Sequence, residues 1–262
     1  MKRILIVGNW KMNLNTHEAS LLVHRLDQHI KVHRDIEVVL APSTLSLQPL
    51  SLEIDRRKFR LAAQNAFYKD EGAYTGEVSY TMLQDLVHYA IIGHSERRIY
   101  FGETLELVRD KVQAAVRNGI TPILCIGETK EEREAGGTKQ VIHDQLTTAL
   151  SNLTSEDIED IVIAYEPVWD IGKDDPAKPR DIEDAISYIR RNIEELYGQE
   201  AAKAVRILYG ASVAPEFVAS ILSLKCGVDG LLVGHASLNY HEFSSIVDGA
   251  YRLLHERPGG DE

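Results

Sequence analysis

Eight short runs of mostly β-branched and aliphatic residues recur along the chain, and this repetition limits the possible folds more than any other feature. The runs are Ile4–Val7, Ile36–Leu40, Phe59–Ala63, Tyr89–Ile92, Pro122–Ile126, Ile161–Tyr165, Val205–Tyr209 and Gly230–Val233. Each is nearly all apolar, which is typical of strands in a parallel sheet covered on both faces. Because eight runs share 262 residues, about 33 are available for each strand and the segment after it. That spacing predicts eight βα units.

Longer amphipathic segments separate the apolar runs and are predicted to be helices. The clearest are Thr16–Val32, Thr104–Asn118, Thr138–Leu150, Asp181–Tyr197 and Tyr240–His255. We place Thr16, Thr104 and Asp181 at their N-caps, and Gly119 and Gly198 just past two of their C-termini. The helices after the second and seventh runs are expected to be short.

No break in this alternation separates two domains. The absence of a Pro-, Gly- or Ser-rich linker and of any low-complexity segment favours a closed (β/α)₈ barrel over a two-domain open sheet. The sequence therefore predicts an α/β protein in which residues 1–256 form one barrel domain. Residues 257–262 are predicted to be a flexible C-terminal tail.

Net charge and apolar content restrict the partners and the compartment. The chain has 29 basic and 40 acidic residues, a net charge of −11, which repels nucleic acids and anionic lipids. No apolar stretch reaches the ~18 residues of a membrane span, and the first apolar run is too short for a signal peptide. Cys125 and Cys226 each lie in an apolar stretch, so we expect buried, reduced thiols. A cytoplasmic protein without nucleic-acid or membrane partners is predicted.

In a barrel of this kind, the chemically active side chains lie where the strands end. Lys11 follows the first run, His94 the fourth and Glu166 the sixth. Each has an ordinary explanation by itself: a solvated lysine, a histidine that caps a helix, and a glutamate in an extended loop before proline. Together they emerge from three strands around one barrel mouth, which predicts a single ligand site.

These residue types suit one kind of reaction. A carboxylate in a water-poor pocket can remove a carbon-bound proton next to a carbonyl, and a neutral imidazole or an ammonium can stabilise the oxyanion that forms. This is the chemistry of aldose–ketose isomerisation through an enediolate. Gly210–Val213 and Gly234–Ser237, after the seventh and eighth runs, offer backbone N–H groups at short helix starts, which is how barrels commonly hold a phosphate. The predicted substrate is therefore a small sugar phosphate.

Five strings at these strand ends closely resemble the triosephosphate isomerase family, in family order and across essentially the whole chain. They are Asn9–Asn13 (NWKMN), Gly93–Arg98 (GHSERR), Cys125–Glu128 (CIGE), Ala164–Trp169 (AYEPVW) and Tyr209–Val213 (YGASV). The resemblance implies a TIM barrel and an enzyme that interconverts dihydroxyacetone phosphate and D-glyceraldehyde 3-phosphate in glycolysis and gluconeogenesis. It implies no metal and no organic cofactor, which agrees with the absence of Walker, Rossmann and CxxC patterns.

The resemblance implies a role for each matching residue. Glu166 is the catalytic base and His94 the neutral electrophile, an acid–base pair for which this family is the standing example of tuning by environment. Lys11 supplies positive charge to the phosphate and the enediolate, with Asn9 as a further donor and Glu96 as a supporting carboxylate. The implied phosphate-binding positions are Gly172, Ser212, Gly234 and His235.

The segment Pro167–Ala177 matches the family's closing lid, which excludes water from the reactive intermediate. The implied residues are Pro167, Val168, Trp169 and Ala177 in the lid, with Tyr209 and Ser212 as the latches that hold it shut. The lid departs from the family pattern, because WDIGKDDPA stands where WAIGTGKTA is usual. Asp174 in place of a glycine, and Pro176 near the far end, are expected to alter the opening rate and the closed geometry.

A larger departure lies in the phosphate segment after the eighth run. His235 stands where the family usually has a second glycine, whereas Ala211 in place of glycine is a milder change. The imidazole either faces the phosphate, where its protonated form adds a hydrogen bond, or is a surface side chain tolerated because the backbone N–H does the binding.

A turn-rich loop, Ala66–Glu77, is longer than most βα connections. A plain surface loop is the default for such a segment. In the family, the matching loop inserts into a second subunit, and the residue at the position of Thr75 approaches that subunit's Asn9 and Glu96. A homodimer with Thr75 at the interface is therefore implied.

Two other functions are still open at this point. An isomerase of a four-carbon ketose phosphate is favoured only by His235 and the altered lid. A phosphate-binding barrel that does not isomerise, either an aldolase with Lys11 as the Schiff-base amine or a simple binder, would leave Glu166 and His94 without a task.

Overall fold

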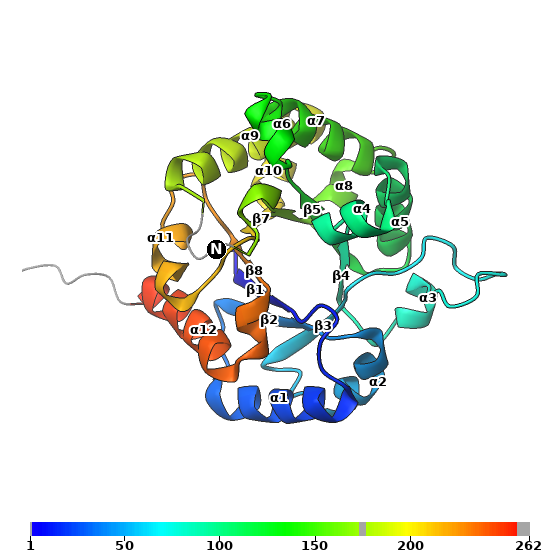
Figure 1. Ribbon diagram of the computed structural model, residues 1–262, viewed down its shortest axis with the longest axis vertical. Coiled ribbons are helices and arrows are strands. Elements are labelled where there is room, and N and C mark those ends of the chain that lie inside the picture. The colour runs from blue at the N-terminus through cyan, green and yellow to red at the C-terminus, as the bar shows by residue number, and fades with distance from the viewer. Residues whose placement is uncertain (1, 173–176, 256–262) are drawn as a thin grey trace, which may run out of the picture.

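The computed structural model describes residues 2–172 and 177–255, in which eight parallel strands close into a barrel. The strands are β1 (Ile4–Asn9), β2 (Ile36–Ala41), β3 (Phe59–Ala63), β4 (Tyr89–Ile92), β5 (Thr121–Ile126), β6 (Val162–Tyr165), β7 (Arg206–Tyr209) and β8 (Gly230–Val233). Each strand pairs with the next, and β1 closes the ring by pairing with β8. Figure 1 looks along this barrel, with the strands in the middle and the helices around them. The predicted (β/α)₈ barrel is confirmed.

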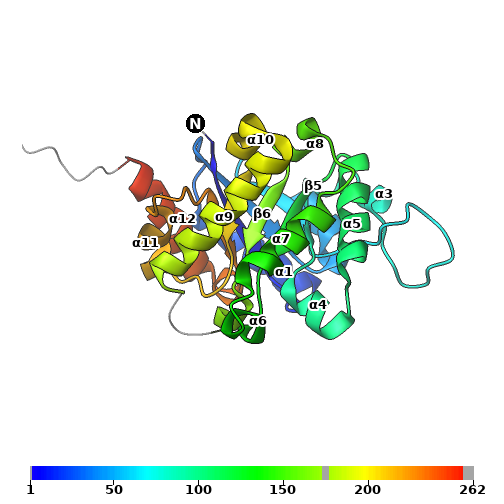
Figure 2. The ribbon, with the colours of Figure 1, turned by 90° about the horizontal axis from the view of Figure 1, so that it is seen from above.

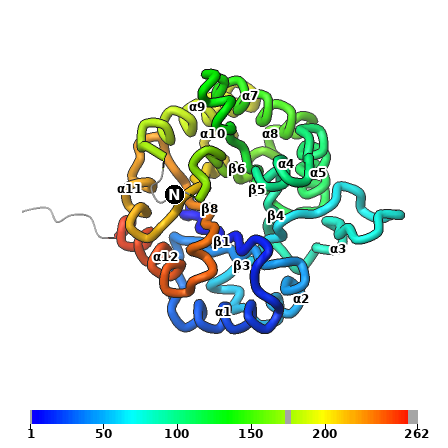
Figure 3. The backbone as a smooth tube through the Cα atoms, in the orientation of Figure 1, coloured from blue at the N-terminus to red at the C-terminus, as the bar shows by residue number. Residues whose placement is uncertain are grey.

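The helices of the described ranges form an outer ring, which the tube in Figure 3 makes easy to follow. They are α1 (Thr16–His29), α2 (Thr44–Glu53), α3 (Tyr80–Leu83), α4 (Ser95–Phe101), α5 (Leu105–Arg117), α6 (Lys130–Glu134), α7 (Thr138–Ala149), α8 (Ser155–Glu159), α9 (Pro179–Tyr197), α10 (Gln199–Ala204), α11 (Val218–Leu222) and α12 (Tyr240–His255). Three 3₁₀ turns, η1 (Val168–Asp170), η2 (Pro215–Phe217) and η3 (His235–Leu238), follow the ends of β6, β7 and β8.

Two predicted N-caps are wrong, one by a single residue and the other by three residues. Asn15, not Thr16, caps α1, because its side chain accepts the Glu18 N–H while the Glu18 carboxylate accepts the N–H of Asn15. Helix α9 starts at Pro179 rather than after Asp181, since proline fits the first turn of a helix, where its missing N–H has no partner to lose. Local capping chemistry, rather than the apolar period, decides these boundaries.

Other helix ends match the sequence analysis. Thr104 caps α5 by accepting the Leu107 N–H, and Gly119 and Gly198, just past α5 and α9, have φ angles of 69° and 88°. These left-handed angles favour glycine. The segment after β7 holds the expected short helix, α11, with five residues, whereas α2 has ten. The short helices α8 and α10, which precede β6 and β7, were not predicted.

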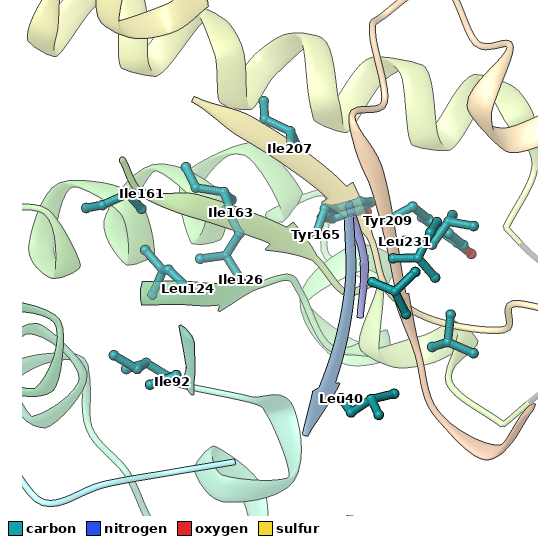
Figure 4. Packing of buried hydrophobic residues seen from close by; sticks show 14 of the residues in the cluster. Leu40, Ile92, Leu124, Ile126, Ile161, Ile163, Tyr165, Ile207, Tyr209 and Leu231 are labelled. Atoms are coloured by element: carbon teal, nitrogen blue, oxygen red, sulfur yellow. The ribbon is translucent and has the colours of Figure 1, made fainter. Parts of the chain in front are cut away.

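The wall of the barrel separates two apolar cores. The inner core consists of alternate strand residues such as Leu5, Val7, Val39, Ile91 and Leu208. The outer core lies between strands and helices and includes the residues labelled in Figure 4, among them Leu124, Ile126, Ile163, Ile207 and Leu231. Successive side chains of a strand point to opposite faces, so both cores require apolar residues. This explains why the strand runs are nearly all apolar.

Among the described residues, no helix is long and apolar enough to cross a membrane. Both cysteines are free thiols; Cys125 is buried as predicted, whereas Cys226 is half-buried. Burial raises the pKa of the Cys125 thiol and raises that of Cys226 to about 11. The predicted tail, 257–262, and the predictions for Asp174 and Pro176 lie outside the described residues.

Candidate active site

Three predicted side chains meet at one end of the barrel. Nε2 of His94 lies 3.1 Å from Oε1 of Glu166. Nζ of Lys11 lies 2.6 Å from Oε1 of Glu96, whose Oε2 is 3.6 Å from Nδ1 of His94. Lys11, His94 and Glu166 border a small cavity, whose lining also includes Asn9, Ile171, Gly210, Ala211, Leu232 and Gly234. The convergence predicted from three separate strand ends is present in the structure.

The start of α4 determines the tautomer of His94. Its Nδ1 accepts the backbone N–H of Glu96 across 3.3 Å, so His94 is the N-cap of this helix. A ring nitrogen that accepts a hydrogen bond carries no proton, and the proton of the neutral imidazole is therefore assigned to Nε2. Nε2–H then faces the carboxylate of Glu166. One nitrogen of the ring, Nδ1, therefore caps the helix, and the other, Nε2, faces Glu166.

Glu166 is almost fully buried, with 3% of its surface exposed. Its Oε2 accepts the backbone N–H of Ser95 across 3.3 Å, and its Oε1 faces His94. Two glycines make room for it. A Cβ on Gly127 would lie 1.8 Å from the carbonyl oxygen of Glu166, and one on Gly210 would lie 3.4 Å from its Cγ. Gly127 had no role assigned from the sequence, because the group that it accommodates comes from another strand.

Lys11 has a φ of 54°, an uncommon angle for a residue with a Cβ. Its N–H donates to Oδ1 of Asn9 across 3.1 Å, and its carbonyl oxygen accepts from Nε2 of Gln64 across 2.9 Å. These contacts hold the backbone turn that directs the ammonium into the mouth. There it lies between Glu96 and the segment after β8, where a Cβ on Gly234 would be 3.9 Å from Nζ. Gln64 is a second positioning residue that the sequence did not reveal.

The first part of the predicted lid, Pro167–Gly172, rests on a buried carboxylate. Glu128 is fully buried and accepts from Nε1 of Trp169 across 2.8 Å and from the hydroxyl of Tyr165 across 3.2 Å. Burial, together with Glu128, raises the pKa of Tyr165, so this hydroxyl stays protonated and donates. The guanidinium of Arg133 lies 3.6 Å from Glu128 and stacks on Trp169, with 4.1 Å between Cζ and the ring centroid.

The predicted latch residues contact the same segment. The hydroxyl of Tyr209 donates to Oδ2 of Asp170 across 2.9 Å, and Oγ of Ser212 donates to the carbonyl oxygen of Asp170 across 2.8 Å. The Ala177 N–H donates to the same Oδ2 across 2.8 Å and to the Tyr209 hydroxyl across 3.2 Å. Asp170, seen in the sequence only as part of the altered pattern, is the centre of these contacts.

The other predicted positions are more exposed. Gly172 has a φ of 78° and is open to solvent, and Gly234 lines the cavity. His235 is exposed at the start of η3 and is not among the described residues that line the cavity. The structure thus places this imidazole on the surface. Thr75 is exposed in the loop between β3 and α3, which projects beyond the ring of helices (Figures 1 and 2).

Comparison with known proteins gives one consistent result. The family model described as triosephosphate isomerase matches residues 4–250. The triosephosphate isomerase of Carboxydothermus hydrogenoformans is 44% identical over 251 residues, which cover 95% of this chain and 100% of the relative. That of Dehalococcoides mccartyi (strain BAV1) is 45% identical over 246 residues, which cover 94% and 96%. That of Moorella thermoacetica is 45% identical over 249 residues, which cover 95% and 99%. The chain belongs to the triosephosphate isomerase family.

Proposed function

We propose that Glu166, His94 and Lys11 carry out the reaction of the family, the interconversion of dihydroxyacetone phosphate and D-glyceraldehyde 3-phosphate. Family membership establishes the reaction itself and its place in glycolysis, and it supports neither the four-carbon substrate nor the non-isomerising barrel. The residue roles rest on one observation above all, the 3.1 Å approach of Nε2 of His94 to the buried Glu166 carboxylate. We assign residues 1–256 to one catalytic domain.

The proposed mechanism moves a proton between two adjacent carbons. Glu166 takes the proton from the carbon next to the carbonyl, and Nε2–H of His94 donates a hydrogen bond to the carbonyl oxygen as it gains negative charge. Glu166 then returns the proton to the neighbouring carbon, while His94 moves protons between the two oxygens. The ammonium of Lys11 stabilises both the enediolate and the phosphate. These steps need no metal and no organic cofactor, because side chains make every proton transfer.

The phosphate is proposed to bind where three segments meet the mouth. Backbone N–H groups at Gly172, Ser212, Gly234 and His235 are the donors implied by the family resemblance. Backbone donors suit a dianion because they are fixed in direction and cost little to order. A cytoplasmic location is part of the proposal, since the substrate is a soluble intermediate of glycolysis.

Substrate choice is tested by measuring turnover with three- and four-carbon ketose phosphates in a coupled assay. The proposal expects isomerisation of the triose phosphate and much slower turnover of the four-carbon compound. Borohydride added with substrate tests the Schiff-base alternative. The proposal expects that no adduct is trapped and that the mass of the protein is unchanged. Faster turnover of the four-carbon compound, or an adduct trapped on Lys11, would remove the proposal.

We further propose that the chain forms a homodimer through the loop Ala66–Glu77. Beside the candidate active site lies a cavity of about 450 Å³, lined by Lys11, Glu96 and Phe101 among others. Large apolar side chains nearby are exposed, with Met12 at 97%, Tyr100 at 75% and Phe101 at 68%. An exposed apolar patch of this kind is typical of a protein interface.

The loop itself is shaped to project. The ring of Phe67 packs against those of Tyr68 and Tyr74, with centroids 4.6 Å apart in both pairs. Gly72 and Gly76 have φ angles of 139° and 90°, which allow the tight turns at its tip. A loop stiffened in this way loses little conformational entropy when it enters a partner's cavity.

The dimer is tested with Thr75→Arg, which places a charge in the proposed contact, and with Thr75→Ser as the matched control. Light scattering is expected to give a dimer for the parent and the Ser variant, and a smaller species for the Arg variant. A fully active monomeric parent would argue against this interface.

A further inference from the structure

We propose that Asp170 is a positioning residue that fastens the segment Pro167–Gly172 over the catalytic cavity. The inference rests on the proposed function and deepens it. It concerns a residue to which neither the proposed mechanism nor the family resemblance gives a task.

The surroundings of Asp170 are unusual for an acidic residue. Only 2% of its surface is exposed, and within residues 2–172 and 177–255 no basic side chain forms an ion pair with it. A carboxylate at this depth is costly unless hydrogen-bond donors satisfy it. Its Oδ2 has two donors, the Tyr209 hydroxyl at 2.9 Å and the Ala177 N–H at 2.8 Å. The carboxylate is therefore placed for hydrogen bonding rather than for charge pairing.

The contacts of Asp170 join parts of the chain that are distant in sequence. Tyr209 is the last residue of β7, and Ala177 lies just before α9. Ser212, after β7, adds a hydrogen bond to the Asp170 carbonyl oxygen. Burial, together with the nearby Asp170 charge, raises the pKa of Tyr209, so its hydroxyl stays protonated and acts as a donor at neutral pH. Asp170 therefore accepts hydrogen bonds both from the end of β7 and from the segment before α9.

These contacts fix the residue that covers the site. Ile171 follows Asp170 directly and lines the same cavity as His94 and Glu166. On the other side of Asp170, Trp169 is held by its 2.8 Å hydrogen bond to Glu128. The two residues that precede Ile171 are thus both held in place. Holding an apolar side chain over the carboxylate keeps water away from the reacting atoms.

The chemistry of the intermediate gives a readout for this cover. In the enediolate, the electron pair of the oxyanion on the terminal carbon can form a carbonyl, the carbon–carbon double bond then shifts to join the middle carbon and the carbon that bears the phosphate, and the carbon–oxygen bond to phosphate breaks as phosphate leaves with the bonding electrons. The remaining enol tautomerises to a 2-oxoaldehyde, so the step needs no oxidant or reductant. An enclosed site opposes this loss, and an open one permits it. Inorganic phosphate released per isomerisation therefore reports how well the segment covers the site.

The test compares Asp170→Ala with Asp170→Asn. Asn keeps an oxygen where Oδ2 lies but lacks the charge, whereas Ala removes both. We expect Ala to raise phosphate release per isomerisation about tenfold and to weaken inhibition by 2-phosphoglycolate to a similar degree, a change typical of losing one charge-assisted hydrogen bond. The Asn variant is expected to lie between Ala and the parent.

A thermal melt of each variant separates positioning from stability. A lower melting temperature with parental phosphate release and parental inhibition would mean that Asp170 only stabilises the fold, which overturns the proposal. An Asn variant as impaired as Ala would overturn the role of the oxygen as acceptor. A parent enzyme that does not isomerise triose phosphates would instead overturn the proposed function, which is a separate result.

Discussion

The two ends of the barrel are built from similar ionisable side chains but use them differently. At the N-terminal end, Arg206 lies 3.0 Å from Glu37 and donates to the hydroxyl of Tyr89 across 2.8 Å, while Tyr89 donates to Glu37 across 3.0 Å. Each group of this triangle has the other two as partners. At the C-terminal end, His94 and Glu166 lie 3.1 Å apart in the wall of a cavity. Figure 2 separates the ends, with α4 and α6 beside the catalytic mouth and α8 and α10 at the opposite end.

The difference lies in how completely the groups are paired. Burial raises the pKa of Tyr89, so its hydroxyl stays protonated near neutral pH and donates to Glu37. At the mouth, the Glu166 carboxylate lies against the Ser95 N–H, the imidazole N–H of His94 and the Cys125 thiol, and it also borders the cavity. A fully paired group stabilises the fold, whereas one that faces a cavity is available to a substrate. The following substitutions test this distinction.

Glu166→Gln should have the largest effect of any single substitution. The amide cannot accept a proton from carbon, so turnover is expected to fall by at least the ~10²–10⁴ that a general base supplies. Far-UV circular dichroism should match that of the parent, because Gln fills the same volume. A folded variant with near-parental turnover would remove Glu166 from the mechanism.

His94→Gln should cost less, about 10²–10³ in turnover, since one stabiliser of the oxyanion is degraded while the base remains. Measuring kcat and KM separately shows where the loss falls. The proposed role requires the loss to be in kcat. A rise confined to KM would show that the imidazole binds the ground state only.

Glu37→Gln tests the opposite end. Breaking the triangle leaves Arg206 without its anion, so urea denaturation should show a loss of about 2 kcal/mol in the free energy of unfolding. Turnover of the folded enzyme should stay at the parental level. The exposed pair Arg180 and Asp184 provides a control, because Asp184→Asn should cost no more than about 0.5 kcal/mol. A loss of turnover with an unchanged free energy of unfolding would contradict the proposed difference between the two ends.

The smallest effect is expected at His235. Its imidazole is exposed and lies outside the lining of the cavity, so the pH dependence of 2-phosphoglycolate inhibition should be the same for the parent and His235→Gly. The inhibitor's own ionisation contributes equally to both curves. Tighter binding by the parent alone, below about pH 6.5, would show that the imidazole reaches the phosphate after all.

The strands and the convergence of Lys11, His94 and Glu166 were predictable from the sequence, because apolar runs mark strands and the residues directly after parallel strands meet at one end of a barrel. Positions that act across the barrel were not. Gly127 makes room for the backbone of Glu166, and Gln64 holds the turn at Lys11. Nothing in the local pattern of either residue shows the distant group that it serves. The same holds for Asp170, whose buried contacts come from Tyr209 at the end of β7 and from Ala177, two residues before α9.

The central claim, that a shielded carboxylate carries a proton between two carbons, is tested most directly by isotope exchange. Dihydroxyacetone phosphate is converted in D₂O, the aldehyde product is trapped by irreversible oxidation, and deuterium at its second carbon is measured by mass spectrometry. The account predicts solvent deuterium in part of the product, because a proton held on Glu166 exchanges before it is returned. It also predicts that Glu166→Gln forms little product of either kind. Product formed at the parental rate without any deuterium at that carbon would indicate direct hydride transfer between the carbons and contradict the account.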